Sequence, residues 1–394
     1  MDSCDVLIVG GGPAGSSCAW ALQRAGLETI LLDKRTFPRE KLCGGWITPA
    51  VLDELEINHA EYERGRVFQP ITGFRTGIMG RVEVETEYGK PVSYGIRRFE
   101  FDDFQLRRCG ARIMEGAPLE SLERSQDGWI ANGEIKARMV IGAGGTFCPV
   151  ARVLGADARQ ESAVVAQEIE FEMTAEQREG CAIRAEIPEL YFCADMKGYG
   201  WCFRKGNFLN VGLGRMDRSS LKRHVAEFLR FLKEAGKLAF DLPASMLGHA
   251  YLLYREIRRN IVADGVLLIG DSAGLAYSMS GEGIRPAIES GLLAAKTVVE
   301  ANGRYGQEEL EKYRASLISR FGNPEKHWSS SVGKYVRPEL IAGAARTLLA
   351  NSWFSRHVIL DRWFLHLNEP ALNFEMPRTI IPAVERSVGV GAGS

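Results

Sequence analysis

The chain has 394 residues, a formal net charge of −1, and 45% hydrophobic and 25% charged residues. This near-neutral balance argues against nucleic acid as the main partner, because nucleic-acid-binding surfaces carry a marked excess of Lys and Arg. The apolar content is that of a folded protein with a large core, and the length is enough for roughly two or three domains.

The first informative segment is a glycine-rich turn that follows a short apolar run. Residues 6–9 are apolar and predict a buried parallel strand. Gly10, Gly12 and Gly15 follow in G-x-G-x-x-G register, and residues 16–25 have helical propensity. In such a turn the first glycine permits a tight bend, the second lets a pyrophosphate approach the backbone, and the third allows the helix to pack closely on the strand. The start of the helix offers free N–H groups and a positive dipole end to phosphates.

Asp33 supports a dinucleotide at this turn. It ends a second apolar run, residues 29–32, at the spacing where a carboxylate accepts hydrogen bonds from an adenosine ribose. The strand, the turn, the helix and the acid together predict a bound dinucleotide. The alternative is a glycine-rich turn beside a polar strand end.

A second glycine-rich segment indicates which dinucleotide is bound. Residues 265–270 are typical of a short buried strand that leads into Asp271, and Gly281 and Gly283 precede a helix of small residues at 287–297. An enzyme that binds only NAD has no need of this distant site, whereas the ribityl chain and ring of FAD reach it. We expect Asp271 to bind a ribityl hydroxyl or the pyrophosphate, the glycines to admit the flavin, and the helix to direct its positive end toward the flavin ring. The alternative is a glycine-rich loop before a core helix.

The remaining patterns predict the domain organisation. The predicted fold class is an α/β FAD-binding domain of Rossmann type, with a β-sheet substrate domain (α+β) and a C-terminal helical cap. The FAD-binding domain is discontinuous, at residues 1–70, 95–160 and 255–305; the substrate domain takes 71–94 and 161–254, and the C-terminal helical region takes 306–394. Alternating and apolar patterns predict strands at 81–86, 165–173 and 208–213 and a helix at 221–235.

The C-terminal region is rich in aromatic and aliphatic residues between 328 and 364. Their helical spacing predicts a cap that packs on the core. The sharper hypothesis is that the cap closes an apolar substrate cavity, with contact to a membrane surface as a second role.

The cysteines predict a reducing environment and no metal site. Eight of them are scattered along the chain, without a Cys-x-x-Cys pair or a histidine spacing suited to zinc. Because buried thiols stay reduced inside cells, we expect a cytoplasmic protein. No signal peptide precedes the first apolar run and no run is long enough to span a bilayer, so weak peripheral membrane association is the only membrane contact that we expect.

Several segments together resemble the p-hydroxybenzoate-hydroxylase-type flavoprotein superfamily, and within it the geranylgeranyl reductase family. The resemblance covers residues 1 to about 300. It depends on the glycine-rich turn at 6–15, the K-x-C-G segment at 41–45, the R-x-x-F-D segment at 98–102, the strand and turn at 140–152, the Y-x-W-x-F segment at 199–203 and the G-D…G-E-G-I segment at 270–284.

The resemblance implies which residues contact FAD and substrate. Arg98 would lie along the FAD, and the loop with Cys43 would lie beside the flavin ring. Cys43, Tyr199 and Trp201 are the predicted catalytic residues, and Trp46, Tyr199 and Trp201 the predicted substrate contacts. The alternative for the aromatic residues is a place in the core of a sheet, and for Cys43 a small buried residue in a glycine loop. The predicted FAD contacts are Gly10, Gly12, Pro13, Ala14, Gly15, Asp33, Lys34, Cys43, Gly44, Arg98, Gly270, Asp271, Gly281, Gly283 and Ile284.

The implied activity is the reduction of isoprenoid C=C bonds by hydride transfer from reduced flavin. An isolated alkene has no carbonyl to polarise it, so a proton must arrive together with the hydride, and aromatic faces can stabilise the cationic character that develops. With an ordinary thiol pKa of ~8.5, Cys43 is a weak acid, and we expect it to position the flavin rather than to donate the proton. The sequence shows no second dinucleotide motif. The resemblance implies NADPH or a ferredoxin-like protein as the electron donor, because this superfamily binds nicotinamide transiently or takes electrons from such proteins.

Two other functions remain open. A flavin-dependent monooxygenase or hydroxylase of the same superfamily shares the FAD motifs, whereas a halogenase would need a W-x-W-x-I-P signature that the sequence lacks. A flavin-binding protein without turnover is the second alternative, and the motifs on the flavin side argue against it. The sequence does not determine the oligomeric state or the identity of the apolar substrate.

Overall fold

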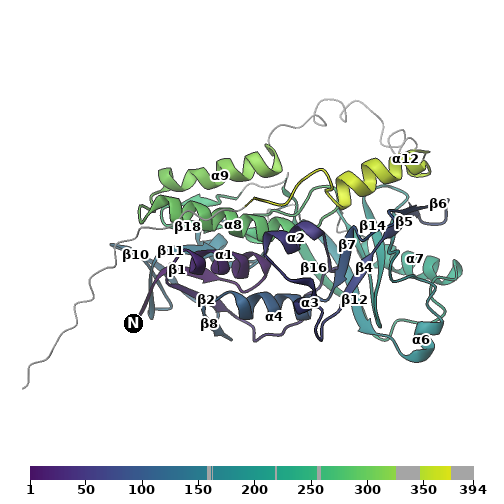
Figure 1. Ribbon diagram of the computed structural model, residues 1–394, viewed down its shortest axis with the longest axis horizontal. Helices are drawn as coiled ribbons and strands as arrows, with labels where there is room; N and C mark the ends of the chain where they lie inside the picture. Colours follow the sequence, from purple (N-terminus) through teal and green to yellow (C-terminus); the bar gives the residue numbers. More distant parts are fainter. Residues whose placement is uncertain (158–160, 162, 218–219, 255–258, 325–346, 374–394) are drawn as a thin grey trace, which may run out of the picture.

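The computed structural model describes residues 1–157, 161, 163–217, 220–254, 259–324 and 347–373. Within these ranges the chain forms three β-sheets, of eight, seven and three strands, together with helices. The two larger sheets lie one after the other along the long axis of the molecule (Figure 1).

The eight-stranded sheet carries the predicted glycine-rich turn. Its order is β17-β18-β11-β1-β2-β8, and the antiparallel strands β10 and β9 branch from β11. Strand β1 pairs in parallel with β11 and β2, and both β1 and β2 are largely buried, as expected for apolar strands inside a parallel sheet. The bounds are β1 (Asp2–Val9), β2 (Thr29–Asp33), β8 (Arg112–Glu115), β9 (Leu122–Ser125), β10 (Gly128–Ala131), β11 (Ile135–Gly142), β17 (Val262–Ala263) and β18 (Val266–Leu268).

Helices α1 (Pro13–Arg24) and α8 (Ile284–Ala301) pack against each other beside this sheet. Helix α1 begins before the predicted residue 16, because a proline fits the first helical position. Helix α8 also begins before the predicted residue 287, directly after its N-cap Gly283. The contact is close, since a Cβ added to Gly291 would lie 2.4 Å from the Ala14 carbonyl oxygen. Both helix starts are therefore held near one another.

Shorter elements surround this pair and complete the first half of the molecule. A small sheet has the order β3-β7-β4. The bounds are α2 (Pro49–Glu54), α3 (His59–Tyr62), α4 (Arg98–Arg108), α5 (Pro149–Val153), the 3₁₀ turn η2 (Gly270–Ser272), α9 (Gln307–Phe321), β3 (Trp46–Ile47), β4 (Phe68–Ile71) and β7 (Ser93–Ile96).

The seven-stranded sheet has the order β16-β12-β15-β14-β13-β5-β6. The predicted strands at 81–86, 165–173 and 208–213 correspond to β6, β12 and β15, and the predicted helix at 221–235 corresponds to α7 (Leu221–Glu234). The bounds are β5 (Gly73–Ile78), β6 (Glu83–Glu87), β12 (Ala163–Glu172), β13 (Glu189–Phe192), β14 (Gly198–Lys205), β15 (Phe208–Arg215), β16 (Leu247–Leu252) and the short helix α6 (Ala175–Glu179).

Alternation along β14 divides its side chains between two faces of this sheet. Trp201 and Phe203 belong to one apolar cluster, whereas Cys202 belongs to the cluster that contains Phe228 of α7. Gly200 makes room for that helix, because a Cβ there would lie 2.6 Å from the Phe228 ring. The period of two in the Y-x-W-x-F segment thus directs its aromatic rings away from α7.

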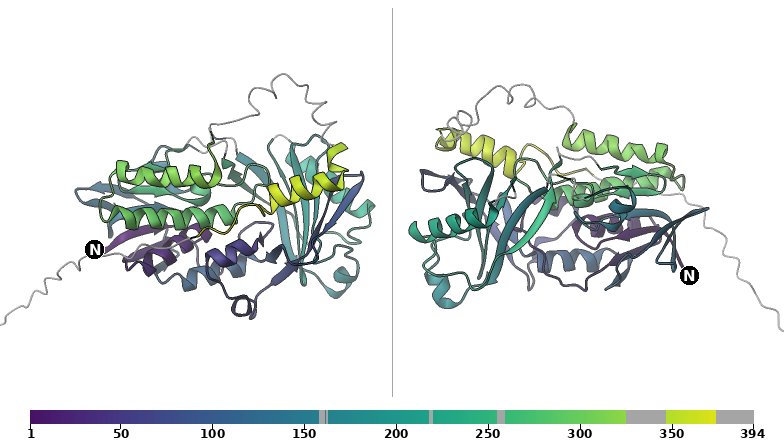
Figure 2. Two further views of the ribbon diagram at one scale, coloured as in Figure 1. Left: turned by 45° about the horizontal axis from the view of Figure 1, so that its top comes forward. Right: turned by 180° about the vertical axis from the view of Figure 1, so that it is seen from behind.

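The C-terminal elements cover the aromatic face. Helix α12 (Ser352–Phe354) continues into the π-helix η3 (Ser355–Phe364), drawn in yellow over the seven-stranded sheet in Figure 2. Leu360 and Phe364 of η3 are buried in the same cluster as Trp46, Trp201 and Phe203. The part of the predicted aromatic stretch at 328–346 lies outside the described residues. In the described ranges, no helix combines the length and apolar character needed to cross a membrane.

Candidate functional site

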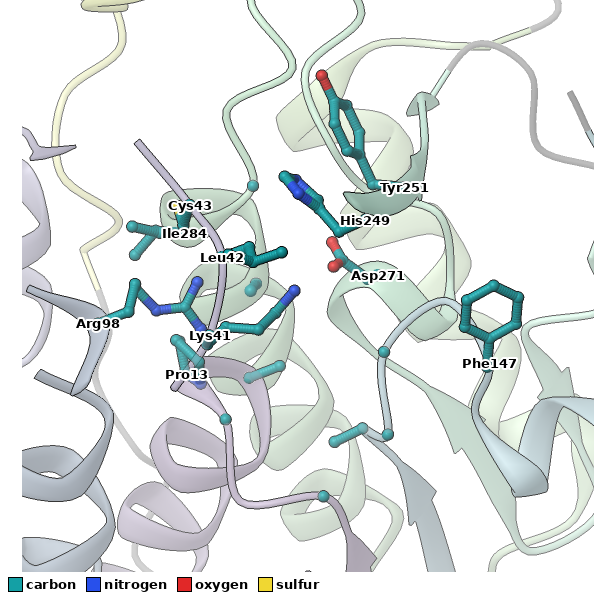
Figure 3. A pocket seen from close by; sticks show the side chains of 18 of the residues that line it. Pro13, Lys41, Leu42, Cys43, Arg98, Phe147, His249, Tyr251, Asp271 and Ile284 are labelled. Carbon is teal, nitrogen blue, oxygen red and sulfur yellow. The ribbon is translucent and has the colours of Figure 1, made fainter. Parts of the chain in front are cut away.

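The glycine-rich segments and the second sheet meet at one pocket with a volume of about 520 Å³ (Figure 3). Its walls come from the ends of β1 and β2, the starts of α1 and α8, the loop before β3, and strands β12, β14 and β16. Ligands of open parallel sheets bind at this position, outside the carboxyl ends of the strands. The predicted residues that line it are Gly10, Gly12, Pro13, Ala14, Asp33, Lys34, Cys43, Gly44, Trp46, Arg98, Tyr199, Trp201, Asp271, Gly281, Gly283 and Ile284.

The first turn shows that its three glycines have different roles. A Cβ on Gly10, whose φ is +117°, would lie 2.3 Å from the Ala143 carbonyl oxygen. One on Gly15 would lie 1.9 Å from the Gly10 carbonyl oxygen, so Gly15 packs inside the turn and is not part of the pocket wall. This packing role is the one expected of the third glycine, and its contact with the cofactor stays a prediction. At Gly12 the nearest atom to a Cβ would be Arg39 Nη2, at 3.5 Å, so a side chain there would extend into the pocket.

Gly270 also lies outside the pocket wall. Its φ is +57°, and a Cβ there would lie 2.9 Å from the Cβ of Ala14 and 3.3 Å from that of Ala287. Its N–H donates to Ser290 Oγ at 2.9 Å. Gly270 therefore fits between α1 and α8, and the pocket wall begins at the next residue, Asp271.

Asp33 organises the turn from the end of β2. Its Oδ2 accepts from the Gly11 N–H at 2.7 Å, and its Oδ1 accepts from the Arg35 N–H at 2.8 Å. The carboxylate also forms part of the pocket wall beside Lys34. Because each carboxylate oxygen has two lone pairs, these backbone contacts leave acceptor capacity for a ribose hydroxyl.

One wall of the pocket is cationic. Arg98 donates to Asp102 through Nε at 2.6 Å and Nη2 at 2.8 Å, and Arg39 Nη2 lies 3.2 Å from the same carboxylate. Although burial lowers the pKa of Arg98, the Asp102 carboxylate raises it above its ordinary value. Lys41 lies beside Arg98 and extends into the pocket (Figure 3). These three cations and one carboxylate leave a net positive charge that suits an anionic ligand.

The opposite end of the pocket is formed by the start of α8. Gly283 is the N-cap of this helix, and Asp271 lies at the pocket wall next to it, with Oδ1 3.3 Å from the position of a Cβ on Gly283. Gly281 has a φ of +71°, and a Cβ there would lie 2.4 Å from Tyr251 Oη. Glu282 Oε1 accepts from the Arg285 N–H at 2.8 Å. The backbone of this loop is therefore exposed to the pocket at its glycines.

These features fit FAD. The starts of α1 and α8, helices of 12 and 18 residues, direct their positive dipole ends at one pocket. Gly12 leaves the space that a pyrophosphate requires, and the cationic wall offsets its charge. Asp33 would hold the adenosine end, the α1 turn and Arg98 the pyrophosphate, and Asp271 with the start of α8 the ribityl chain and the ring.

The Cys43 loop is anchored to the second sheet. Trp201 Nε1 donates to Asn210 Oδ1 at 2.7 Å, and Asn210 Nδ2 donates to the Cys43 carbonyl oxygen at 3.1 Å. Gly44 lies against Trp201, with 3.6 Å between a Cβ position there and Trp201 Nε1. Burial raises the pKa of the Cys43 thiol, with Arg98 opposing the shift. Trp201 thus positions the loop that would face the flavin.

An aromatic cluster continues from this part of the pocket toward η3. The Trp46 ring lies 4.8 Å from Phe203 and 6.0 Å from Phe364. The Tyr199 ring lies 5.3 Å from Phe364 and 6.0 Å from Trp201, and its hydroxyl donates to the Ser280 carbonyl oxygen. The three predicted substrate residues therefore lie together, and a C-terminal ring packs on them.

Sequence reasoning missed several residues of the pocket wall, and three of them lie on the seven-stranded sheet. They are Glu168 on β12 and His249 and Tyr251 on β16. In the described structure, Glu168 Oε2 and His249 Nδ1 are buried without a hydrogen-bond partner. Burial, together with Lys41 and Arg98, lowers the pKa of His249 to about 3, so its ring is neutral. No motif marks these residues, because each becomes part of the site only through the pairing of its strand.

Comparison with known families matches residues 3–318 to the FAD binding domain. A menaquinone reductase of Mycobacterium tuberculosis is 30% identical over 331 residues, which cover 75% of this chain and 76% of that protein. A digeranylgeranylglycerophospholipid reductase of Methanosphaera stadtmanae is 26% identical over 355 residues, or 84% of this chain and 87% of that protein.

A solved structure of a geranylgeranyl bacteriochlorophyll reductase-like protein from Thermoplasma acidophilum has the same fold. It aligns with a TM-score of 0.74 over 92% of this chain and 97% of that chain, at 23% identity. The fold thus follows a known arrangement of an FAD-binding sheet and a second sheet.

Proposed function

The chain belongs to the geranylgeranyl reductase family of FAD-dependent oxidoreductases, and on that premise we propose that it reduces C=C bonds of an isoprenoid substrate. The observation that carries the proposal is the continuity between the FAD pocket and the aromatic cluster of Trp46, Tyr199 and Trp201. The names of the relatives suggest two sources of the isoprenoid chain, a geranylgeranyl lipid and a menaquinone.

The aromatic wall suits this chemistry. When bound and reduced, the flavin supplies a hydride, and the alkene develops cationic character at its other carbon. The faces of Trp46 and Trp201, both buried, can stabilise that charge in a site from which water is excluded. Each buried CH₂ of a prenyl chain adds about 0.8 kcal/mol of binding without polar contacts.

Cys43 has a positioning role in this proposal. Its carbonyl oxygen is fixed through Asn210 to Trp201, so the loop has a defined place beside the flavin site. Its thiol pKa is raised by burial, which makes the thiol a poorer acid than a free cysteine. We therefore assign Cys43 to the orientation of the flavin edge, with Tyr199 and Trp201 facing the substrate.

The wider assignments rest on the same reasoning. We propose residues 1–70, 95–160 and 255–305 as the FAD-binding domain, 71–94 and 161–254 as the substrate domain, and 306–394 as the C-terminal helical region.

We also propose a cytoplasmic location, because all eight cysteines are free thiols. Leu348 and Trp353 are exposed apolar residues near the cap and support weak peripheral membrane association. NADPH or a ferredoxin-like protein is the proposed electron donor.

The test is anaerobic photoreduction of the bound flavin followed by addition of a geranylgeranyl lipid or of menaquinone. Reoxidation of the flavin together with the gain of two hydrogens in the prenyl chain supports the proposal. Fragment masses locate these hydrogens, because a menaquinone ring also gains two hydrogens when it is reduced to the quinol. Reoxidation only by dioxygen, with a hydroxylated product, identifies a monooxygenase instead. If no substrate is changed, the chain binds flavin without turnover.

A further inference from the structure

Glu168 is a buried acid in the pocket wall for which the FAD-binding motifs provide no role. It lies in the middle of β12, opposite Gly212 of β15 and Leu247 of β16. Its side chain is 1% exposed, it lines the pocket, and in the described part of the chain its Oε2 has no hydrogen-bond partner. A buried polar atom without a partner is costly, so an unpaired oxygen at a cavity wall indicates a ligand or reaction partner.

Glu168 lies beside the predicted substrate wall. A Cβ on Gly212 would lie 2.2 Å from Trp201 Cζ2 and 2.7 Å from Glu168 Cβ, so Trp201 and Glu168 share the space above this glycine. Glu168 and Cys43 both line the pocket, and the charge of Glu168 contributes to the raised pKa of the Cys43 thiol. The acid thus lies beside the Trp201 ring, in the same pocket wall as the Cys43 loop.

The charged neighbours leave Glu168 without a close cation. Lys205 Nζ donates to Glu170 Oε2 at 2.7 Å and to the Ile96 carbonyl oxygen at 2.9 Å, and Arg97 also binds Glu170. Burial raises the pKa of Glu168 to about 7, with Glu170 adding to the shift and Lys205 and Lys41 opposing it. The other titratable groups around it are Cys43, Tyr199 and Tyr251, all with raised pKa values, and His249. Glu168 therefore exchanges its proton near neutral pH, with the protonated form prevailing below about pH 7.

We propose that Glu168 is the catalytic acid that gives the double bond its proton. In this step the O–H bond of the Glu168 carboxyl group breaks and a C–H bond forms at one alkene carbon, while the hydride of the reduced flavin forms the C–H bond at the other. The π bond is lost, the alkene is reduced and the flavin is oxidised. The carboxylate takes a proton from solvent before the next turnover. This inference depends on the proposed reduction of an isoprenoid.

The other acids of the pocket suit the step less well. Glu282 is bound to the Arg285 N–H at the start of α8, and the Tyr199 hydroxyl is bound to the Ser280 carbonyl oxygen. The neutral ring of His249 has no acidic proton to give near neutral pH. Glu168 combines a carboxyl group of suitable acidity with an unpaired oxygen at the wall.

The first test reads the protonation of Glu168 without turnover. Difference infrared spectra of the FAD-loaded protein are compared for wild type, Glu168→Gln and the control Glu172→Gln, an exposed residue on the same strand. We expect a protonated-carboxyl band that fades as the pH rises through about 7, is absent in Glu168→Gln and persists in the control. A band unchanged by Glu168→Gln would overturn the proposal, and the wild-type titration remains available if that variant fails to fold.

The second test is single-turnover reoxidation of the photoreduced flavin by geranylgeraniol, or by menaquinone with saturation of its prenyl chain measured by mass spectrometry. We expect Glu168→Gln to slow this step roughly 10²- to 10⁴-fold, with flavin content unchanged, and the wild-type rate to fall above pH 7. Glu168→Asp, which keeps the acid, should retain part of the rate. Turnover at the wild-type rate by Glu168→Gln refutes the acid role alone, whereas a wild type that reduces neither lipid refutes the proposed function.

Discussion

Gly12 and Gly15 lie in one turn, but their surroundings differ. Gly15 is closed in by the Gly10 carbonyl oxygen, whereas the space at Gly12 opens into the pocket. The G-x-G-x-x-G pattern predicts this division, with Gly12 for the approach of the pyrophosphate and Gly15 for close packing. At the scale of the residue, the atoms that a side chain would meet separate a binding position from a packing position.

Gly12→Val should give a folded protein without flavin. The new side chain would occupy the pyrophosphate space while the turn itself keeps its backbone contacts. The yellow colour and the flavin absorbance should be lost, with the circular dichroism spectrum unchanged. As a contrast, Gly15→Val should fail to fold, since its Cβ would lie 1.9 Å from a carbonyl oxygen. A Gly12→Val protein with a full flavin spectrum would contradict this assignment.

Glu168 should make stability depend on pH. Burial raises its pKa from an ordinary 4.5 to about 7, so the folded state holds the proton more tightly than the unfolded chain. The stabilising effect is complete below pH 4.5 and is lost as the pH rises through about 7. The difference in free energy of unfolding between Glu168→Gln and wild type should therefore rise by roughly 3 kcal/mol, in favour of the variant, as the pH increases from 4.5 to about 7. Urea titrations at several pH values measure the difference, and a gap independent of pH would exclude the shifted pKa.

At the scale of the element, buried charges tie the C-terminal segment to α8 and α9. Glu289 binds Arg285 at 2.7 Å and Arg320 at 2.6 Å. Both arginines donate to the Pro370 carbonyl oxygen at 2.8 Å, and Glu54 Oε1 accepts from the Leu372 N–H at 2.9 Å. The segment that follows η3 is thus held by side chains from three helices. This network explains how a short terminal element keeps a defined place over the aromatic cluster.

Arg320→Ala should loosen this segment. It removes one partner of buried Glu289, a change that costs about 3–5 kcal/mol when a buried pair is broken. We expect a lower melting temperature and faster proteolysis between residues 347 and 373, with FAD content retained. The matched control is Arg314→Ala on the same helix, whose pair with Glu311 is about 37–39% exposed and should change stability by about 0.5 kcal/mol or less. Equal proteolysis of the two variants would remove the proposed role of Arg320.

At the scale of the whole molecule, the pocket lies where the two large sheets meet, and η3 packs beside it. The eight-stranded sheet supplies the glycine-rich turn and Asp271, the seven-stranded sheet supplies Trp201 and Glu168, and η3 packs on the aromatic cluster between them. Each large sheet also has a separate cluster of buried apolar side chains. A hydrophobic substrate requires such a junction, because its chain must leave water while its double bond reaches the flavin.

Phe364→Ala tests whether η3 closes the substrate side of the pocket. Phe364 is 1% exposed and packs on Tyr199 and Trp46, but it is not part of the FAD pocket wall. We expect a loss of about 3–5 kcal/mol in stability, FAD content near that of wild type, and slower flavin reoxidation by a long isoprenoid. The control is Trp353→Ala, whose ring is 64% exposed. Wild-type reoxidation by folded Phe364→Ala protein would show that η3 does not shape the substrate site.

The sequence by itself determined the parts of the site that depend on local chemistry. A glycine-rich turn between an apolar strand and a helix has few possible structures, so Gly10, Gly12, Asp33 and the start of α8 were predictable as a dinucleotide site. The period of two along β14 likewise determined that Tyr199, Trp201 and Phe203 share a face.

Only the tertiary structure decided which residues distant in sequence lie beside these motifs. Glu168, His249 and Tyr251 carry no motif, and they reach the pocket because β12 pairs with β15 and β16. Gly15 and Gly270 match the motifs, yet close packing of α1 on β1 and α8 removes them from the pocket wall. The physical reason is that burial, and with it the raised pKa of Glu168, depends on neighbours distant in sequence.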